Sequence, residues 1–316
     1  NIPYSFERSR FSAAADIRLF DELRVSAGYD RNELDRDFQE VAEQTEDAGW
    51  GQLRWRPAPW FEVRARGGAS RRDISRYDEN VAVSLGQNPL MRKYNLAYRY
   101  REFGELSTTI SARTKPISLT FTGFSADDSY SESKLGLTSS DELRYTLDLS
   151  WAISDAVSTY VMHGSESVEA EQFGSAAFST PDWSAAHDDQ FDHWGVGLHW
   201  RPPESDFELR LDYSNGEGDT RILVASNGTE SALPELSSSL DSLRAEVIWR
   251  WSDKLDLTAD VRYESFLSDD WALADVGPDT LPTVLTLGAI PYDYDIWAVG
   301  VGFRYYLGTR NTQLIN

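Results

Sequence analysis

The stretch KLDLTADVRYESF, Lys254–Phe266, decides the fold of this protein. Apolar residues and one tyrosine occupy every second position from Leu255 to Tyr263, while charged residues and Thr258 occupy the positions between them. Successive side chains of an extended strand point to opposite faces, so this segment has one apolar face and one charged face. Such a strand is expected to separate two different environments.

The same alternation recurs along the whole chain, in about a dozen segments of roughly ten residues each. Asp241–Trp251 repeats the pattern and is joined to Lys254–Phe266 by a very short turn, which predicts a β-hairpin. Residues 23–30, 143–151 and 207–213 follow the same rule. The pattern is therefore a property of the whole molecule.

Two kinds of connection alternate between these segments. Short turns are expected at 20–22, 56–59, 114–116, 154–155, 202–206 and 252–254. Long polar loops are expected near 31–47, 71–104, 127–141, 167–188, 217–238 and 267–291. This alternation predicts an antiparallel sheet with tight turns at one end and long loops at the other.

Together these features predict an all-β fold: a large, porin-like, transmembrane, antiparallel, up-and-down β-barrel, with residues 1–316 in one domain. A barrel strand crosses the bilayer in about 9–11 residues, with apolar side chains toward lipid and polar side chains toward the lumen. Short periplasmic turns and long outer loops are typical of this class. A soluble sandwich would not separate its loops by length so consistently.

The number of strands bears on how much of a barrel the chain forms. Counting residues 6–19 as the first, we expect about thirteen strands, whereas single-chain bacterial barrels have even numbers with both termini in the periplasm. We therefore expect a barrel of more than thirteen strands, of which this chain is the C-terminal portion, unless one strand escapes the pattern.

Composition excludes several function classes. The 316 residues contain no Cys, which excludes thiolate nucleophiles, Cys-based zinc sites and covalent haem attachment by this chain. The formal net charge of -22 argues against nucleic acid as a partner, because phosphates require a basic surface.

Aromatic residues gather near the short turns, where a barrel places its membrane-interface girdle. A soluble sheet would instead place its aromatic residues in mid-strand, inside a core. The predicted periplasmic girdle consists of Phe20, Trp55, Trp60, Trp151, Trp200, Phe207, Trp249 and Trp251.

The charged faces of the strands are expected to line the lumen. The predicted lumen-facing contacts of a partner are Arg64, Arg66, Arg144, Arg210, Asp212, Arg244, Glu246, Arg250, Asp260, Arg262 and Arg304. A wall of mixed sign can bind a protein inside the barrel. It can equally line a water-filled pore, with its charges neutralising one another across strands.

Three segments carry a resemblance to a known family. SLGQNPLMRKYNLAYRYR, Ser84–Arg101, is similar to a loop signature of the decahaem-associated outer-membrane proteins, the MtrB/PioB family. DTLPTVLTLG, Asp279–Gly288, and YDYDIWAVGVGFRY, Tyr292–Tyr305, resemble the C-terminal part of that family. The likeness extends over essentially the whole chain, although the family's N-terminal region, often with a Cys-x-x-Cys, has no counterpart here.

The resemblance implies a porin sheath in the outer membrane of a Gram-negative bacterium. In such a conduit a periplasmic multihaem c-type cytochrome is inserted in the lumen and carries electrons across the membrane, and an extracellular multihaem cytochrome can dock on the outer loops. The chain would contact lipid and lipopolysaccharide and would bind no haem itself. A diffusion porin without a cytochrome remains the alternative.

Weaker features concern metals and catalysis. Carboxylates at Asp35, Asp37, Asp127 and Asp128 are candidate Ca²⁺ ligands, but their spacing matches no known calcium loop, which favours a solvated acidic surface. A hydrolase would need a nucleophile beside its base, and His163 near Ser165 is the nearest such pair. We therefore expect no enzymatic activity.

Overall fold

A computed structural model of the protein describes residues 5–271 and 293–307. It contains one sheet of fourteen strands and, within the described residues, one short helix, α1 (Glu79–Ser84). The strands are β1 (Phe6–Arg18), β2 (Leu23–Arg36), β3 (Glu43–Ala58), β4 (Phe61–Ile74), β5 (Arg99–Ser111), β6 (Ile117–Ser129), β7 (Gly136–Ser154), β8 (Val157–Gly174), β9 (Trp183–Trp200), β10 (Phe207–Ser226), β11 (Thr229–Ala232), β12 (Leu236–Ser252), β13 (Leu255–Asp269) and β14 (Tyr294–Tyr305).

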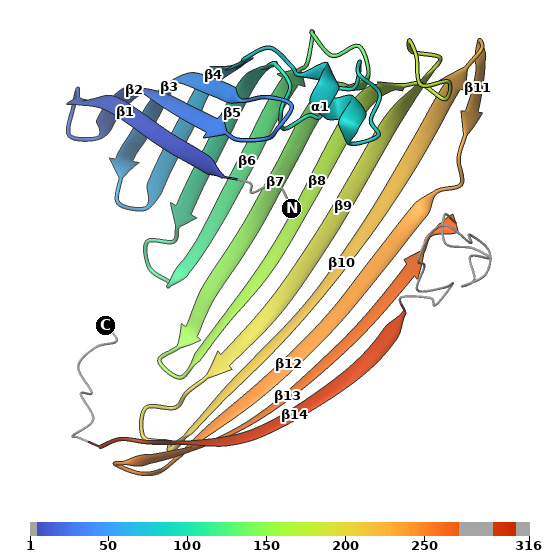
Figure 1. The fold of residues 1–316 in the computed structure, drawn as a ribbon. Coiled ribbons are helices and arrows are strands. Elements are labelled where there is room, and N and C mark those ends of the chain that lie inside the picture. Colours follow the sequence, from blue (N-terminus) through green and yellow to red (C-terminus); the bar gives the residue numbers. More distant parts are fainter. Residues whose placement is uncertain (1–4, 272–292, 308–316) are drawn as a thin grey trace.

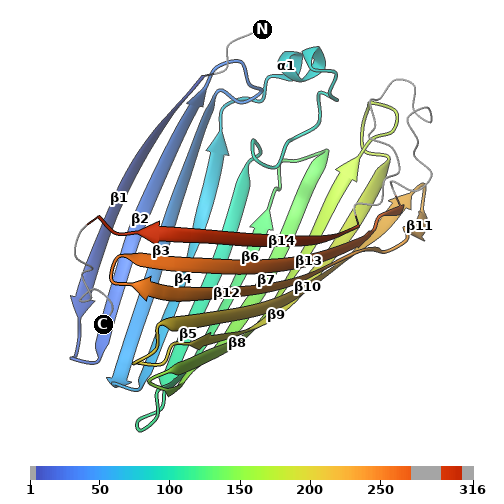
Figure 2. The same ribbon diagram turned by 90° about the horizontal axis from the view of Figure 1, so that it is seen from below.

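The topology is an up-and-down meander. Thirteen strands pair antiparallel in chain order from β1 to β14, and the short β11 pairs only with β10. The prediction of an all-β, antiparallel, up-and-down fold is confirmed. Figures 1 and 2 show the sheet curling along its length, with β1 and β14 at its two edges. Among the described strands, none pairs with the outer side of either edge.

Short turns join alternate pairs of strands, as expected. Two residues separate β3 from β4, β7 from β8 and β12 from β13, and all of these turns lie at the same end of the sheet (Figure 2). The longest connection among the described residues is 75–98, between β4 and β5, at the opposite end. We call residues 75–98 the cap.

The expected loop bounds were too wide, because the strands continue well into them. The loop expected near 31–47 is limited to 37–42, since β2 runs to Arg36 and β3 begins at Glu43. The other outer loops shorten in the same way, to 75–98, 130–135, 175–182 and 227–235, the last with β11 inside it. Beyond the membrane both faces of a strand meet water, so the alternation disappears while the hydrogen-bond ladder continues. Of the loop expected at 267–291, residues 272–291 lie outside the described residues.

Register places the apolar residues of all strands on one face. Leu211 pairs with Ala245, Val247 pairs with Ala259, and Ala259 pairs with Val301. We call this the apolar face and the opposite one the charged face. Along β7 the apolar face is continuous from Leu143 to Ile153, which matches the 9–11 residues that a tilted strand needs to cross hydrocarbon.

Apolar side chains on this face are open to the surroundings rather than packed. Val301 is 86% exposed and Phe303 is 76% exposed on β14, and Leu147 is 41% exposed in the middle of β7. A compact soluble body would bury such residues in a core. The only buried apolar cluster among the described residues instead lies at the cap, where Val41, Tyr77, Ala82 and Leu96 meet. No helix in residues 5–271 or 293–307 has the length and apolarity to cross a membrane.

Candidate partner-binding wall

The charged face carries all eleven residues predicted to contact a partner. The pairs Arg210–Glu246 and Glu246–Asp260 are direct cross-strand neighbours, so their side chains project from the same face. By the same register this face holds Arg64, Arg66, Arg144, Arg210, Asp212, Arg244, Glu246, Arg250, Asp260, Arg262 and Arg304. Their predicted role in partner binding stays a prediction.

Part of the charged face neutralises itself through ion pairs between strands. Glu208 is only 6% exposed and accepts from Arg210 at 2.6 Å, with His199 Nε2 at 3.0 Å and Arg250 at 3.5 Å. Arg210 also donates to Glu246 at 3.3 Å. This cluster spans β9, β10 and β12 near the short turns. Such pairing stabilises the wall whether or not a partner is present.

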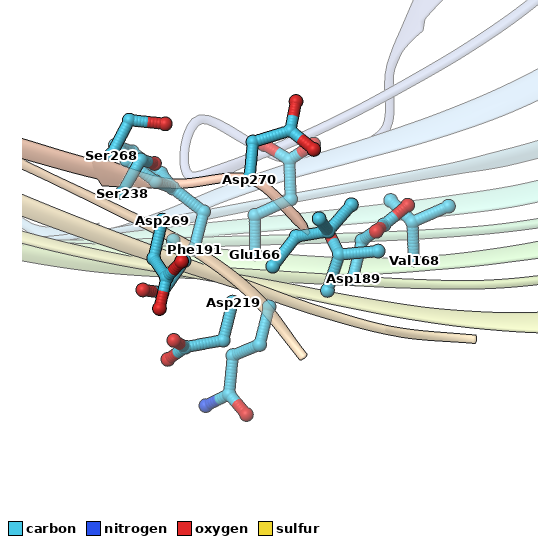
Figure 3. Close-up of a pocket in the computed structure, with 14 residues that line it drawn as sticks. Glu166, Val168, Asp189, Phe191, Asp219, Ser238, Ser268, Asp269 and Asp270 are labelled. Atoms are coloured by element: carbon cyan, nitrogen blue, oxygen red, sulfur yellow. The ribbon is translucent and has the colours of Figure 1, made fainter. Parts of the chain in front are cut away.

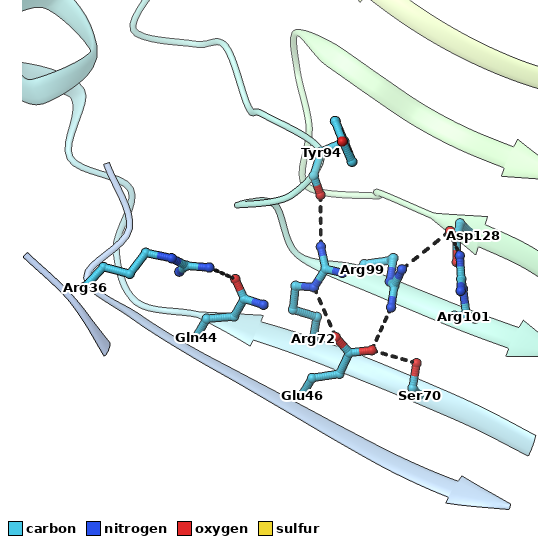
Figure 4. Close-up of polar contacts among 9 residues, drawn as sticks. All are labelled: Arg36, Gln44, Glu46, Ser70, Arg72, Tyr94, Arg99, Arg101 and Asp128. Carbon is cyan, nitrogen blue, oxygen red and sulfur yellow. Dashed lines mark hydrogen bonds and ion pairs between the residues drawn. The ribbon is translucent and has the colours of Figure 1, made fainter. Parts of the chain in front are cut away.

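A second ionic cluster lies at the end of the sheet that carries the cap, and Figure 4 shows its contacts. The Glu46 carboxylate accepts from Arg99 at 2.6 Å and from Arg72 at 3.4 Å. Arg101 donates two bonds of 2.6 Å to Asp128, which is 5% exposed. Burial works to raise the pKa of Glu46, but the charges of Arg99 and Arg72 outweigh it and hold that pKa below its ordinary value.

This cluster fastens the cap to the charged face. Arg72 donates to the Tyr94 carbonyl at 2.9 Å, and Lys93 pairs with the buried carboxylate of Glu40. The Asn88 side chain donates to the Ser179 carbonyl, in the β8–β9 connection, at 3.0 Å. The cap therefore reaches from β4 to the β8–β9 connection at this end of the sheet. The sequence signature Ser84–Arg101 lies mostly within it, but the pattern alone did not reveal its folded structure.

Aromatic side chains also project from the charged face, which the alternation argument missed. The guanidinium of Arg66 lies over the Trp50 ring at 4.7 Å and near the Phe103 ring at 5.8 Å. Trp50 Nε1 donates to Asp30 at 2.9 Å. Arg144 covers Phe124 in the same way, at 4.4 Å. The available signal was an aromatic residue at a charged-face position, such as Trp50 between Gly49 and Gly51.

The sign of the charged face changes around the sheet. On this face, strands β1–β5 carry eleven arginines and only five acids. The arginines are Arg8, Arg10, Arg18, Arg24, Arg36, Arg54, Arg64, Arg66, Arg72, Arg99 and Arg101. The acids are Asp16, Asp30, Glu46, Glu62 and Glu105. Strands β6–β10 carry seven acids, Asp128, Glu142, Asp148, Glu166, Asp189, Glu208 and Asp212, against two arginines, Arg144 and Arg210. Strands β12–β14 are balanced, with Arg244, Arg250, Arg262 and Arg304 against Glu246, Asp256, Asp260 and Glu264.

The eight residues of the predicted girdle all lie in the short turns or within four residues of them. Phe207 stacks on Trp249 at 5.4 Å, and Trp249 meets Trp251 edge-on at 4.5 Å, on the apolar face. Phe20 and Trp60 lie in the turns themselves, between β1 and β2 and between β3 and β4. Their role at a membrane interface stays a prediction.

A second row of aromatic residues marks the other margin of the apolar belt. Trp194 packs against Tyr213 at 5.0 Å, and Tyr263 packs against Trp297 at 4.6 Å. The Tyr213 hydroxyl donates to Asp241 at 2.6 Å, directly beyond the belt. Aromatic side chains with a wet polar end are typical of membrane interfaces, so a girdle is expected at both margins of the belt. Sequence analysis identified only the girdle near the turns.

The candidate calcium ligands are not brought together. Asp127 and Asp128 are adjacent in β6 and point to opposite faces, and Asp128 is already paired with Arg101. Asp37 accepts from Ser5, and Asp35 lies in β2. Within the part of the chain that the structure describes, no three His, Asp or Glu side chains are grouped as a metal site would require. The geometry gives these four carboxylates no shared ion.

His163 and Ser165 both project from the apolar face of β8, and the His163 ring contacts Tyr145 at 5.9 Å. No hydrogen bond joins the His163 imidazole to the Ser165 hydroxyl among the described contacts. The pair lacks the nucleophile–base geometry of a hydrolase.

An antiparallel meander with an apolar belt, rows of aromatic residues at both margins and a charged opposite face is the architecture of an outer-membrane β-barrel protein. The chain belongs to the MtrB/PioB family: the family described as "Putative outer membrane beta-barrel porin, MtrB/PioB" matches residues 1–307. The protein is therefore located in the outer membrane, and its family is one of porins rather than enzymes.

Known relatives agree with this assignment. Outer membrane protein MtrB of Shewanella baltica (strain OS185) is 26% identical over 306 residues, which cover 96% of this chain and 44% of that protein. The chain thus spans less than half of the length of this relative. Among solved structures, the unliganded ferric citrate transporter FecA is similar in fold, with a TM-score of 0.50, 8% identity, and coverage of 94% of this chain and 53% of that one. The ferric-catecholate import receptor Fiu from E. coli K12 gives a TM-score of 0.47 at 7% identity, over 83% of this chain and 59% of that one.

Proposed function

We propose that the protein forms the wall of a sheath that encloses a multihaem c-type cytochrome and insulates it from lipid, so that electrons can cross the outer membrane. The periplasmic cytochrome occupies the lumen, against the charged face. A second, extracellular multihaem cytochrome docks on the outer loops. Family membership and the resemblance of the signature segments support this role.

The observation that carries the proposal is the charged face at the level of the hydrocarbon belt. On β7, Arg144 and Asp148 project opposite to Leu143 and Leu147, in the part of the strand that lies within the belt. Unpaired polar groups in hydrocarbon cost several kcal/mol each, so the charged face must meet water or protein. A cytochrome with a hydrated, charged surface needs such a wall to cross the membrane.

The absence of Cys in these 316 residues supports the proposal that the redox groups belong to the partner. Covalent attachment of c-type haem uses a Cys-x-x-Cys-His motif, and the 316 residues contain no Cys and only four His. Three of these, His187, His193 and His199, lie on the charged face. In the proposed complex the wall supplies insulation and orientation, and every haem belongs to the cytochromes.

A diffusion porin is the second candidate, favoured by the self-neutralising clusters of the wall. Glu208 with Arg210 and Arg250, and Glu46 with Arg72 and Arg99, need no partner to compensate their charges. A wall of this kind can also line a channel filled with water.

Co-purification separates the two candidates. The protein, extracted with its native complex from outer membranes in mild detergent, is expected to elute together with c-type haem absorbance at a fixed haem-to-protein ratio. An unrelated porin of the same membrane, prepared in parallel, is the control and should carry no haem. If the protein elutes without haem and makes liposomes permeable to small solutes, the sheath proposal is wrong and the protein is a diffusion porin.

A further inference from the structure

On the charged face, local ion pairs do not cancel the excess of arginines on β1–β5 or the excess of acids on β6–β10. Neither Arg8 nor Arg66 makes an ion pair with any described residue, and the Arg66 guanidinium lies over the rings of Trp50 and Phe103. Both belong to β1–β5, where arginines exceed acids, and Arg66 forms no ion pair with Glu105, its direct cross-strand neighbour. These strands therefore present cationic groups that the wall itself does not neutralise.

The opposite excess occurs on β6–β10, and two of its acids border a cavity of about 320 Å³ that lies between β8 and β13 (Figure 3). Glu166 of β8 and Asp189 of β9 line it from the charged face, and Asp269 and Asp270 line it from the end of β13. No basic side chain lines this cavity among the described residues. Neither Glu166 nor Asp189 forms an ion pair with another described residue.

The surroundings strengthen these fields. Lipid covers the apolar belt, so the charges at the level of the belt act in a space with walls of low dielectric constant, where potentials are larger than on an open surface. A protein inside such a space is attracted on one side by cations and on the other by carboxylates. Wrong orientations place like charges together and are disfavoured by their repulsion.

We propose that the charged face orients the protein in the lumen about the barrel axis, with an acidic surface of the partner against β1–β5 and a basic surface against β8–β10. This inference rests on the proposed function, because it requires a protein in the lumen. It adds the chemistry of the two partner surfaces and the strands that each one contacts. The ionic clusters at Glu46 and Glu208 stabilise the wall, while the uncancelled charges select the orientation.

Site-specific photo-crosslinking in native outer membranes tests the orientation directly. A photoreactive amino acid replaces Ser107 on β5 in one variant and Ser214 on β10 in another, both on the charged face. The crosslinked peptides of the haem protein are then sequenced by mass spectrometry. Leu106 and Tyr213, the neighbours that project from the apolar face, are the matched control positions and are expected to give no crosslink to a haem protein.

The expected result is that Ser107 crosslinks to acidic stretches of the haem protein and Ser214 to basic stretches of the same protein. Crosslinks from both positions to the same haem protein, but without this difference in sign, would overturn the orientation and leave the sheath intact. If neither position crosslinks to any haem protein although the barrel is assembled, the sheath proposal is wrong, and the proposed orientation is then wrong as well.

Charge reversal gives a second, independent readout. Arg66→Glu and Glu166→Lys are each expected to lower the haem retained per barrel severalfold after a wash at moderate salt. Arg71→Glu, on the apolar side of β4 beyond the belt, is the control and should retain haem like the unaltered protein. Heat-modifiable migration on gels confirms that each variant is folded. Unchanged retention in both reversal variants would contradict the proposal.

Discussion

Single residues decide where the wall is rigid, and Glu46 is the clearest case. Its carboxylate joins Arg72 and Arg99, and Arg72 in turn holds the Tyr94 carbonyl of the cap. The cap has a small apolar core around Leu96 and Ala82, so these polar bonds contribute a large part of its attachment. Loss of this carboxylate charge leaves the partly buried Arg72 guanidinium without an ion-pair partner and leaves Arg99 with Asp128 alone, at 3.7 Å.

We predict that Glu46→Gln loosens the cap by about 1.5–3 kcal/mol, the range for hydrogen bonds to charged groups. The measurement is the rate at which a protease added outside intact cells cleaves within residues 75–98. The matched control is Glu33→Gln, which removes an exposed pair with Arg31 worth less than about 1 kcal/mol. Equal cleavage rates in the two variants would show that the cluster does not hold the cap.

For single residues, the sequence predicted best the face of the sheet from which a side chain projects. It predicted least well which residues that side chain contacts. Alternation assigned Arg210, Asp260 and Arg304 to one face, and the register places them there. It could not reveal that Trp50 projects from the charged face, because a period-two pattern treats an aromatic residue as apolar. Nor could it separate Asp127 from Asp128 as candidate ligands until the strand placed them on opposite faces.

At the scale of elements, each strand has a section in the membrane and a section beyond it. Strands β7–β10 have 18–20 residues, whereas crossing hydrocarbon takes about 9–11. Alternation predicted the first section well and the second poorly, because polar residues occupy both faces beyond the belt. For this reason the short turns were predicted accurately and the outer loops were predicted too long.

We predict that Leu147→Arg, on the apolar face of β7, destabilises the barrel by about 2–4 kcal/mol, the cost of an arginine near the bilayer midplane. Thr146→Arg, one residue away and on the charged face, is the matched control and should cost much less. Urea unfolding of the protein in lipid vesicles measures the difference. A similar loss of stability in both variants would mean that the two faces of β7 meet the same environment.

At the scale of the whole molecule, the chain is strongly acidic while its charged face is nearly balanced. The net charge is -22, yet the charged face carries comparable numbers of arginines and acids, unevenly distributed around the sheet. The excess acid therefore lies on the loops and on the strand sections beyond the belt. Sequence composition predicted an acidic protein, but only the register revealed the change of sign between β1–β5 and β6–β10.

The central claim is that odd and even residues of one strand meet different surroundings, and the absence of Cys makes it directly measurable. Single cysteines are introduced in β13 at Thr258 and Asp260, and at Ala259 and Val261, and the barrels are treated in native membranes. After removal of the lumen partner by a high-salt wash, a water-soluble maleimide should label the first two positions and not the last two, while a lipid-partitioning reagent should do the reverse. Equal labelling of all four positions by the water-soluble reagent would contradict the account.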